Sequence, residues 1–188
     1  MDALRSAPAL PARSRELLAG AERAFAHRGY FGTSTAAVAA EIGVSQPYVM
    51  QVFGSKERLF VATHRFSGEK IVDCLHTELQ ADPFDLRAAG RAYQRLVSLE
   101  RDAVRVFAHG FSAADVPAIG VESRRLLTEV HGLLRDAGAS RHQITDFLGR
   151  GMLTNTLLLL SADLDVIGDG YDVISALAVD QSPPAETR

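Results

Sequence analysis

The spacing of apolar positions in the first 60 residues predicts three helices separated by short breaks. Apolar residues recur at helical spacing over residues 13–28, and Gly29 then provides a helix end. Two shorter helices follow, one ending near residue 42 and one covering 46–53. Hydroxyl residues precede both short helices and can cap their first turns. The N-terminal part of the chain is therefore expected to be a compact group of three helices.

The remaining sequence is also helical in its pattern, and no strand periodicity is present. Breaks rich in Asp, Gly, Ser and Pro separate the segments. The expected helices cover residues 56–80, 84–111, 117–135, 141–161 and 171–179. Residues 1–11 are expected to be a disordered arm and residues 180–188 a loose tail. The sequence thus predicts an all-α protein with a helical bundle behind its N-terminal helices.

The stretch from residue 35 to residue 52 has the pattern of two helices joined by a tight turn. Gly43 stands at the turn, where the backbone needs a positive φ, and Ala39 stands where the helices approach most closely. The residues expected to form the small core of this unit are Val38, Ile42, Val44, Val49 and Val52. This arrangement is typical of a helix-turn-helix, whose second helix enters the major groove of DNA. Alanine-rich helices joined by glycine also occur in helical proteins that bind no nucleic acid, so spacing alone leaves both readings open.

The charge distribution restricts any DNA contact to the N-terminal part. The whole chain of 188 residues has a formal net charge of −3. Residues 1–60 contain seven basic and five acidic side chains, a net of +2, whereas residues 61–188 contain thirteen and eighteen, a net of −5. A DNA-binding surface would therefore be local, on an otherwise acidic protein.

Other function classes lack their sequence patterns. The single cysteine, Cys74, cannot form an internal disulfide, and no Cys or His cluster has zinc spacing. Neither a signal peptide nor an apolar stretch long enough to span a bilayer is evident, so we expect a cytoplasmic protein without a membrane partner. Neither a phosphate-binding glycine loop nor a catalytic serine motif is present, and the acidic residues 163–172 lack two ligands of a calcium loop. We expect neither enzymatic activity, nor a metal, nor a cofactor.

The stretch AFAHRGYFGTSTAAVAAEIGVSQPYVMQVFGSKERLF, residues 24–60, strongly resembles the N-terminal DNA-binding domain of the tetracycline-repressor (TetR) family. The matching residues, in the spacing of that family, are Ala24-Phe25, Arg28-Gly29-Tyr30, Thr33, Gly43-Val44-Ser45, Phe53, Gly54, Ser55 and Lys56. The resemblance implies a helix-turn-helix DNA-binding domain at residues 12–60 and an effector-binding and dimerisation domain at residues 61–179. It also implies a ligand-responsive repressor that binds a palindromic operator as a homodimer.

The resemblance also implies which side chains contact DNA. Thr33, Ser34 and Thr35 would hold a phosphate at the start of the second helix, and Lys56 would supply an ammonium group to another phosphate. Glutamine can bond adenine through two hydrogen bonds, and apolar surface can pack on a thymine methyl group. The expected contacts from the third helix are Ser45, Gln46, Pro47, Tyr48 and Gln51.

Two residues depart from the family pattern. Met50 and Val52 stand where many members have Tyr and His, which help to grip the DNA backbone. Tyr48, Gln51 and Arg58 would have to compensate for the loss, and otherwise affinity would be modest. The alternative is a helical sensor or interaction protein of the same fold with weak or lost DNA binding.

In the C-terminal region, the resemblance covers only the overall layout. It implies a pocket for a small apolar or amphipathic effector. Binding of the effector would change the separation of the two DNA-reading units through the helix that starts at Lys56. The candidate pocket residues are Phe66, Tyr93, Phe107, His109 and Phe111. The candidate dimer residues, on the last two helices, are Phe147, Leu148, Gly151, Met152, Leu157, Ile174 and Leu177. By periodicity alone, both sets could equally be the core of a single chain.

Overall fold

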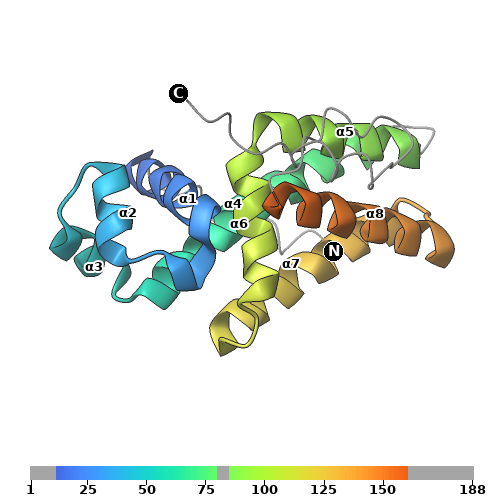
Figure 1. Ribbon diagram of the computed structural model, residues 1–188. Coiled ribbons are helices and arrows are strands. Elements are labelled where there is room, and N and C mark those ends of the chain that lie inside the picture. Colours follow the sequence, from blue (N-terminus) through green and yellow to red (C-terminus); the bar gives the residue numbers. More distant parts are fainter. Residues whose placement is uncertain (1–11, 80–84, 161–188) are drawn as a thin grey trace, which may run out of the picture.

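The computed structural model describes residues 12–79 and 85–160, which form eight α-helices and contain no strand (Figure 1). The helices are α1 (Ala12–Gly32), α2 (Thr35–Ile42), α3 (Gln46–Phe53), α4 (Lys56–Leu79), α5 (Leu86–Leu99), α6 (Arg101–Ser112), α7 (Pro117–Asp136) and α8 (Arg141–Leu159). The all-α prediction is confirmed. The expected arm at 1–11, the helix at 171–179 and the tail at 180–188 lie outside the described residues.

The helices are arranged in two groups joined by two shared helices. In Figure 1, α1, α2 and α3 lie at one end of the molecule and α5, α7 and α8 at the other. Helix α4 runs from one end towards the other, and α6 stands across the middle between the two groups. We call residues 12–60 the N-terminal unit and residues 61–160 the helical body.

Helix α1 runs further than the sequence predicted, although its direction changes at the expected residue. Gly29 has φ 62° and ψ −167°, and helical structure then resumes up to Gly32. Positive φ favours glycine. A Cβ atom at Gly29 would lie 2.7 Å from Nδ1 of His109 on α6, so a side chain there would also push the two helices apart.

The predicted single helix over residues 84–111 is wrong, because the chain breaks at Glu100 into α5 and α6. Glu100 has φ −123° and ψ 45°, outside the helical region. Its carboxylate accepts a hydrogen bond of 2.7 Å from Lys70 Nζ on α4. Neither glycine nor proline marks the break, so the sequence pattern carries no local signal for it. The turn lets α6 cross to α1 and α4, against which it packs.

Two apolar cores stabilise the fold, and α4 contributes to both. Leu59 and Phe60 of α4 lie in the core of the N-terminal unit, whereas Ile71, Val72 and Leu75 lie in the core of the helical body. The smaller core also includes Val106, Ala113 and Ile119, which come from α6, α7 and the turn between them. The N-terminal unit is therefore completed by residues far along the chain.

A buried carboxylate fixes α1 on the body. Glu22 is only 5% exposed, accepts a hydrogen bond of 2.6 Å from the Ser67 hydroxyl, and forms an ion pair of 2.8 Å with Lys70. Lys70 also pairs with Glu100 at the break between α5 and α6. Partial burial alone would lower the pKa of Lys70. The hydrogen bonds to Glu100 and Glu22 outweigh this effect, so the pKa of Lys70 is raised and its ammonium form is favoured.

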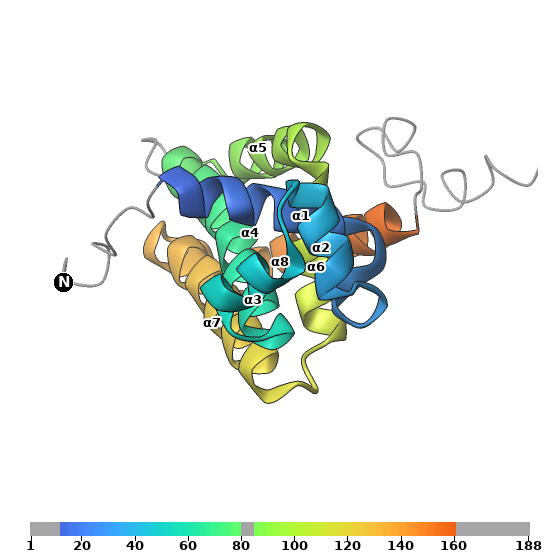
Figure 2. The ribbon, with the colours of Figure 1, turned by 90° about the vertical axis from the view of Figure 1, so that its left-hand side faces the viewer.

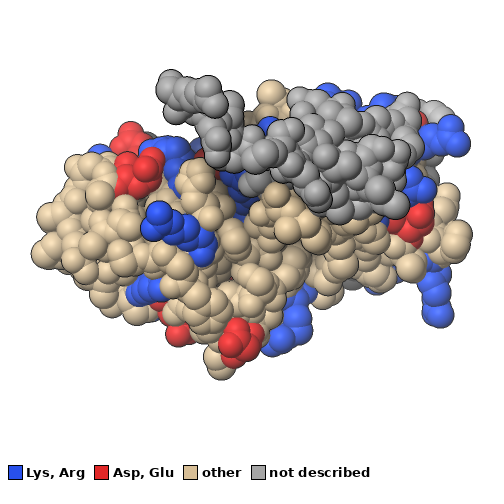
Figure 3. All heavy atoms as spheres, viewed as in Figure 1, with Lys and Arg blue, Asp and Glu red and all other residues tan. Residues whose placement is uncertain are grey.

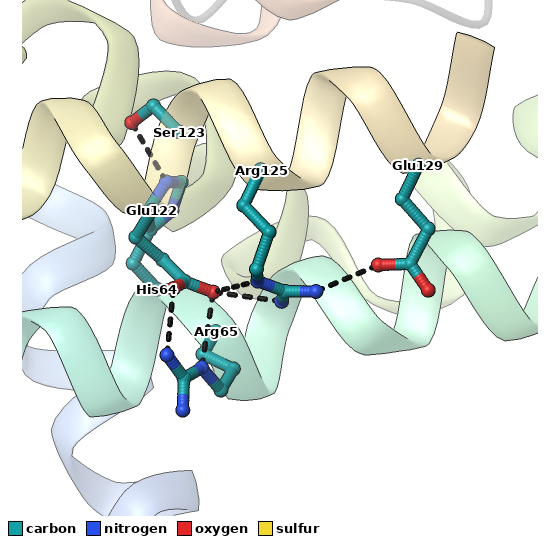
Figure 4. Close-up of polar contacts among 6 residues, drawn as sticks. All are labelled: His64, Arg65, Glu122, Ser123, Arg125 and Glu129. Carbon is teal, nitrogen blue, oxygen red and sulfur yellow. Dashed lines mark hydrogen bonds and ion pairs between the residues drawn. The ribbon is translucent and has the colours of Figure 1, made fainter. Parts of the chain in front are cut away.

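A second buried carboxylate joins α4 to α7. Arg65 donates two hydrogen bonds to Glu122, of 3.0 Å and 2.7 Å, and Arg125 donates two more, of 2.9 Å and 2.7 Å (Figure 4). Arg125 also reaches Glu129 at 2.7 Å. Burial raises the pKa of Glu122, but the two guanidinium groups outweigh burial, so its pKa is lowered and the carboxylate stays ionised.

Candidate DNA-binding surface

Helices α2 and α3 form a helix-turn-helix whose turn has the predicted geometry. Gly43 has φ 76° in the left-handed region, and its N–H and that of Val44 bond to carbonyl groups at the end of α2. Ala39 is 3% exposed, which leaves no room for a larger side chain at the helix crossing. The Ser45 hydroxyl then accepts a hydrogen bond from Tyr48 N–H and so caps α3. The positive φ predicted for Gly43 is confirmed.

The small core of this motif differs from the prediction at one position. Val38 and Val49 are buried, and Ile42 and Val44 are partly buried against them. Val52 is 43% exposed, so its assignment to the core is wrong. Phe53, the next residue, packs against this core at the end of α3 instead.

Helix α3 presents polar side chains at the outer end of the molecule. Figure 2 looks onto this end, with α2 and α3 toward the viewer. Gln46, Pro47 and Gln51 are exposed, and Tyr48 and Met50 are half-buried. The side chains that the sequence analysis expects to meet base edges therefore lie on one accessible helix.

The hydroxyl residues before α2 have different surroundings. Ser34 is exposed, and its hydroxyl caps α2 by accepting a hydrogen bond of 3.1 Å from Ala37 N–H. Thr35 accepts a hydrogen bond of 2.9 Å from the side-chain amide of Gln46, so the starts of α2 and α3 lie together. Thr33 is buried, 4% exposed, and its hydroxyl donates to the carbonyl of Ala24. Thr33 therefore supports the connection between α1 and α2 and does not display its hydroxyl on the surface.

Lys56 opens α4 beside this surface and is held by an aromatic ring. Its Nζ lies 4.6 Å from the centre of the Tyr30 ring, within the range of a cation–π interaction. Ser55 caps the same helix by accepting a hydrogen bond of 3.1 Å from Arg58 N–H. The capped first turn of α4 thus carries two basic side chains, Lys56 and Arg58.

Two residues that the sequence analysis did not assign also belong to this surface. Arg13 of α1 is exposed, and a hydrogen bond with Tyr48 raises the pKa of its guanidinium group. Tyr30 orients Lys56 through its ring. The Arg-Gly-Tyr motif includes Tyr30 but does not reveal this contact. Spacing along the chain could not show either contact, because the two residues of each contact come from different helices.

One side of the motif is only weakly charged. In Figure 3, most of the surface over α2 and α3 is uncharged, with basic and acidic side chains scattered at its borders. Arg23 at the edge is neutralised by an ion pair of 2.7 Å with Glu41. This side of the motif therefore offers few cations to DNA phosphates.

A continuous series of aromatic rings joins this surface to the body. Ring centroids lie 5.3 Å apart for Tyr30 and Phe60, 6.1 Å for Phe60 and His64, and 5.9 Å for His64 and Phe107. His64 is fully buried and hydrogen-bonded to the Ser123 hydroxyl at 3.0 Å. Burial lowers the pKa of His64 to about 4, so the imidazole is neutral at pH 7.

The structure brings three of the five candidate pocket residues together. Tyr93, Phe107 and Phe111 line a small apolar cavity between α4 and α8. Phe66 does not line it, and its ring instead lies 4.9 Å from Lys70 Nζ. His109 is also elsewhere, since its Nε2 lies 3.2 Å from the carbonyl of Ala26 at the contact between α6 and α1. Phe66 and His109 thus do not line this cavity, and helical spacing could not show this, because it does not reveal which face of α4 or α6 meets the cavity.

The candidate dimer residues on α8 also divide into different environments. Met152 is 47% exposed, while Phe147, Leu148 and Gly151 are half-buried. Leu157 is 1% exposed within its own chain and belongs to the core, so a partner subunit could not contact it in this structure. The two remaining candidates, Ile174 and Leu177, lie outside the described residues.

Metal sites and membrane-spanning helices are both absent from the part of the chain that the structure describes. Within residues 12–79 and 85–160, no three His, Cys, Asp or Glu side chains are grouped so that they could hold a metal ion. Within the same ranges, no helix combines the length and the apolar character needed to cross a membrane.

Comparison with known proteins agrees with this geometry. Residues 17–63 match the family model described as "Bacterial regulatory proteins, tetR family". No curated protein matches the chain.

Solved structures share the fold over most of the chain. A TetR transcriptional regulator from Legionella pneumophila has a TM-score of 0.65 and 18% identity, covering 90% of this chain and 95% of that one. A transcriptional regulator from Rhodococcus sp. Rha1 has a TM-score of 0.63 and 24% identity, covering 87% and 90%. The multidrug binding protein EbrR, complexed with imidazole, has a TM-score of 0.62 and 22% identity, covering 88% and 86%.

The family model covers the helix-turn-helix and the start of α4, and the structural likeness extends through the helical body. Residues 17–63 thus carry the N-terminal domain of the TetR family of bacterial regulatory proteins, and the described helices as a whole share the fold of solved transcriptional regulators.

Proposed function

We propose that this protein is a repressor that binds a palindromic operator as a homodimer and is released by a small, mainly apolar effector. The observation that carries the proposal is the exposed face of α3, where Gln46, Pro47 and Gln51 stand beside the capped first turn of α4. Exposed polar side chains beside a helix start that carries a lysine support the proposal, because DNA recognition requires both base contacts and phosphate contacts. Neither a catalytic function nor a cofactor is part of the proposal.

Phosphate contacts would come from the starts of α2 and α4. Ser34 caps the start of α2, Lys56 opens α4, and the amide of Gln46 on α3 already bonds Thr35. A phosphate bound at Thr35 would compete for that hydroxyl and free the Gln46 amide to meet a base. Positioning on the backbone and base reading would therefore be linked through one hydrogen bond.

Selection of genomic fragments followed by a gel shift tests the proposal directly. We expect enrichment of a palindrome whose half-sites are one or more helical turns apart. Gln46→Ala should change preference at one defined base pair of each half-site, whereas Gln94→Ala on the body should leave the profile unchanged. An identical base profile for Gln46→Ala would contradict the assignment of Gln46.

The phosphate role of Lys56 has a separate test. Lys56→Ala should weaken binding to all sequences alike and lower the slope of log K against log salt by about one unit. Arg124→Ala removes an exposed cation from the body and serves as the matched control. If base preference changes instead of the salt slope, Lys56 is misassigned.

A dimer is proposed because one short recognition helix reads too few base pairs. Exposed apolar side chains on α8 support it, since Met152, Leu159 and Leu160 are 47%, 37% and 62% exposed. Sedimentation at micromolar concentration should show twice the chain mass of 20.3 kDa. A single species of 20.3 kDa would exclude the dimer.

The second candidate is a sensor or interaction protein that has kept the fold but lost DNA affinity. It is favoured by Met50 and by the exposed Val52, and by the low charge over α3. The fragment selection separates the two candidates, since the absence of any enriched palindrome at low salt would support the sensor and exclude the repressor.

A further inference from the structure

The first turn of α4 carries an arginine that folds back onto the end of α3. A Cβ atom at Gly54 would lie 3.2 Å from Nη1 of Arg58 and 3.8 Å from its Cζ. Gly54 is the residue at which α3 ends, since its N–H bonds the carbonyl of Met50 at 2.8 Å and its φ is 80°. The guanidinium group of Arg58 therefore lies beside the last turn of α3, although it belongs to the next helix.

The end of α3 has no cation of its own. Its last turn consists of Met50, Gln51, Val52 and Phe53, none of which is charged. Gln51 and Val52 are exposed, so this turn reaches solvent. Arg58 therefore supplies the positive charge at this end of the helix.

The charge of Arg58 is exposed and is not neutralised by any residue that the structure describes. Within residues 12–79 and 85–160, Arg58 forms no ion pair, whereas Arg23 of the same unit pairs with Glu41 at 2.7 Å. The backbone N–H of Arg58 is already bonded to the Ser55 hydroxyl. The group that remains able to bind an anion is thus the guanidinium group, and the backbone of the helix start is not needed for it.

Lys56 and Arg58 open the same helix but lie against different neighbours. Residues two positions apart on an α-helix are separated by roughly 200° around its axis. Lys56 Nζ lies 4.6 Å from the centre of the Tyr30 ring of α1, whereas Arg58 lies against Gly54 at the end of α3. The two cations therefore occupy different flanks of α4.

We infer that Arg58 is a second phosphate-binding residue of the DNA-binding surface, which acts from the C-terminal end of α3 and binds a different phosphate from Lys56. This inference rests on the DNA binding in the proposed function and requires neither an operator nor an effector. A guanidinium group suits the role, because it is always charged and its parallel N–H donors match two phosphate oxygens. Gly54 is part of the arrangement, since a side chain there would collide with the guanidinium group.

Binding of the full chain to a mixed-sequence DNA duplex at several salt concentrations tests the assignment. Arg58→Ala should lower the slope of log K against log salt by about one unit, because one phosphate contact is lost. Between about 50 mM and about 200 mM salt, the affinity of the parent protein should thus fall roughly fourfold more than that of the variant. An unchanged slope would overturn the assignment.

Arg124 on α7 provides a matched control. Its Nη1 lies 3.3 Å from the Cβ position of Gly120, so Arg124 is also an exposed arginine folded onto a glycine, but it belongs to the helical body. Arg124→Ala should leave the slope unchanged. Equal decreases in the two variants would indicate an effect of net charge and would refute a contact at Arg58.

A purely structural role of Arg58 is the alternative, because a cation at the C-terminus of a helix also stabilises that helix. Arg58→Lys keeps the charge and should keep the slope, whereas Arg58→Gln should lower it as Arg58→Ala does. Thermal unfolding of the same variants separates the two roles. A lower midpoint temperature with an unchanged slope in Arg58→Gln would mean that Arg58 only stabilises α3, and the inference would be wrong.

The double variant tests whether the two cations bind separate phosphates. Lys56→Ala combined with Arg58→Ala should lower the slope by about two units. A decrease of about one unit would show that both side chains bind the same phosphate and would contradict the inference.

The outcome is separable from that of the proposed function. If the chain enriches a palindrome but Arg58→Ala keeps the slope of the parent protein, the assignment of Arg58 alone fails. If Arg58→Ala lowers the slope and no palindrome is enriched, repression alone fails and the phosphate contact stands. A parent protein that binds no duplex at low salt would refute both.

Discussion

The N-terminal unit and the helical body use the same devices at their helix ends but differ in what fixes their arrangement. Ser45 and Ser140 each cap a helix through the N–H three residues later, and Gly43 and Gly138 both have positive φ. The helical body also contains a cluster in which the partly exposed Arg65 and Arg125 pair with the buried carboxylate of Glu122, whereas the buried Glu22 of the N-terminal unit pairs with Lys70 of the body. Helix ends are thus set locally in both regions, whereas the packing of long helices relies on contacts between residues distant in sequence.

The largest effect is expected from breaking the core that the two regions share. Phe60→Ala should destabilise the protein by about 3–5 kcal/mol, because this fully buried ring packs against Phe25 at 4.9 Å and against Tyr30. Leu134→Ala in the core of the body should have an effect of about 2–5 kcal/mol. Urea unfolding followed by circular dichroism measures both. We expect one cooperative transition in each variant, and a separate early transition in Phe60→Ala would show that the N-terminal unit unfolds alone.

The next effect concerns His64, which lies where the two regions meet. Its pKa of about 4 in the folded protein is below the ordinary value of 6.5, so the unfolded chain takes up the proton first as pH falls. The free energy of unfolding therefore falls as pH falls from about 6.5 towards 4. Above pH 6.5, the neutral His64 causes no such loss. Between pH 7 and pH 5, the free energy of unfolding of the parent protein should fall by about 2 kcal/mol more than that of the His64→Gln variant. Urea unfolding at the two pH values measures this difference. If the parent protein and the variant lose the same free energy of unfolding between them, His64 is not buried in its neutral form.

Matched glycine substitutions sharpen the comparison of the turns. Gly43→Val and Gly138→Val should each cost about 1–2 kcal/mol, because both residues have positive φ and neither Cβ position meets a neighbour. Steric overlap with neighbouring residues therefore adds nothing to the backbone strain. Gly43→Val should also lose DNA affinity at temperatures where it is folded, and Gly138→Val should not. Equal DNA affinities for the two variants would show that the turn does not orient α3.

The smallest effect is expected from the serine caps. Ser45→Ala should cost about 1 kcal/mol in unfolding free energy, because one N–H at the start of α3 loses its partner. Ser140→Ala should cost somewhat more, since Ser140 also takes part in a capping box in which Gln143 bonds its backbone N–H. The reverse order would mean that the cap of α3 has a larger role in the fold than its single hydrogen bond indicates.

The parts that the sequence predicted correctly have local causes. The turn at Gly43, the caps at Ser34 and Ser45 and the exposed face of α3 follow from residue types and spacing over a few positions. The break at Glu100 could not be predicted, because it carries no glycine or proline and depends on Lys70 from another helix. Short-range patterns specify the helix ends that a glycine or a hydroxyl cap marks, and they specify neither an unmarked break nor which helices exchange ion pairs.

The candidate sites show the same limit. The aromatic positions on α4 and α6 have the same helical spacing, yet Phe107 and Phe111 line the cavity while Phe66 and His109 do not. Which of these residues line the cavity depends on how α6 crosses α4. There Gly110 leaves room for the His64 ring, since a Cβ atom at Gly110 would lie 2.2 Å from its Cε1.

The shared core has a practical consequence for engineering this protein. Val106, Ala113 and Ile119 close the apolar interior around Phe25 and Phe60, so a fragment cut after residue 60 would leave that interior open to water. Chimeras that transplant the DNA-reading helices onto another regulator therefore need to carry these three positions with them. The unit of exchange is a set of residues that are neighbours in space, and it does not coincide with any single stretch of the chain.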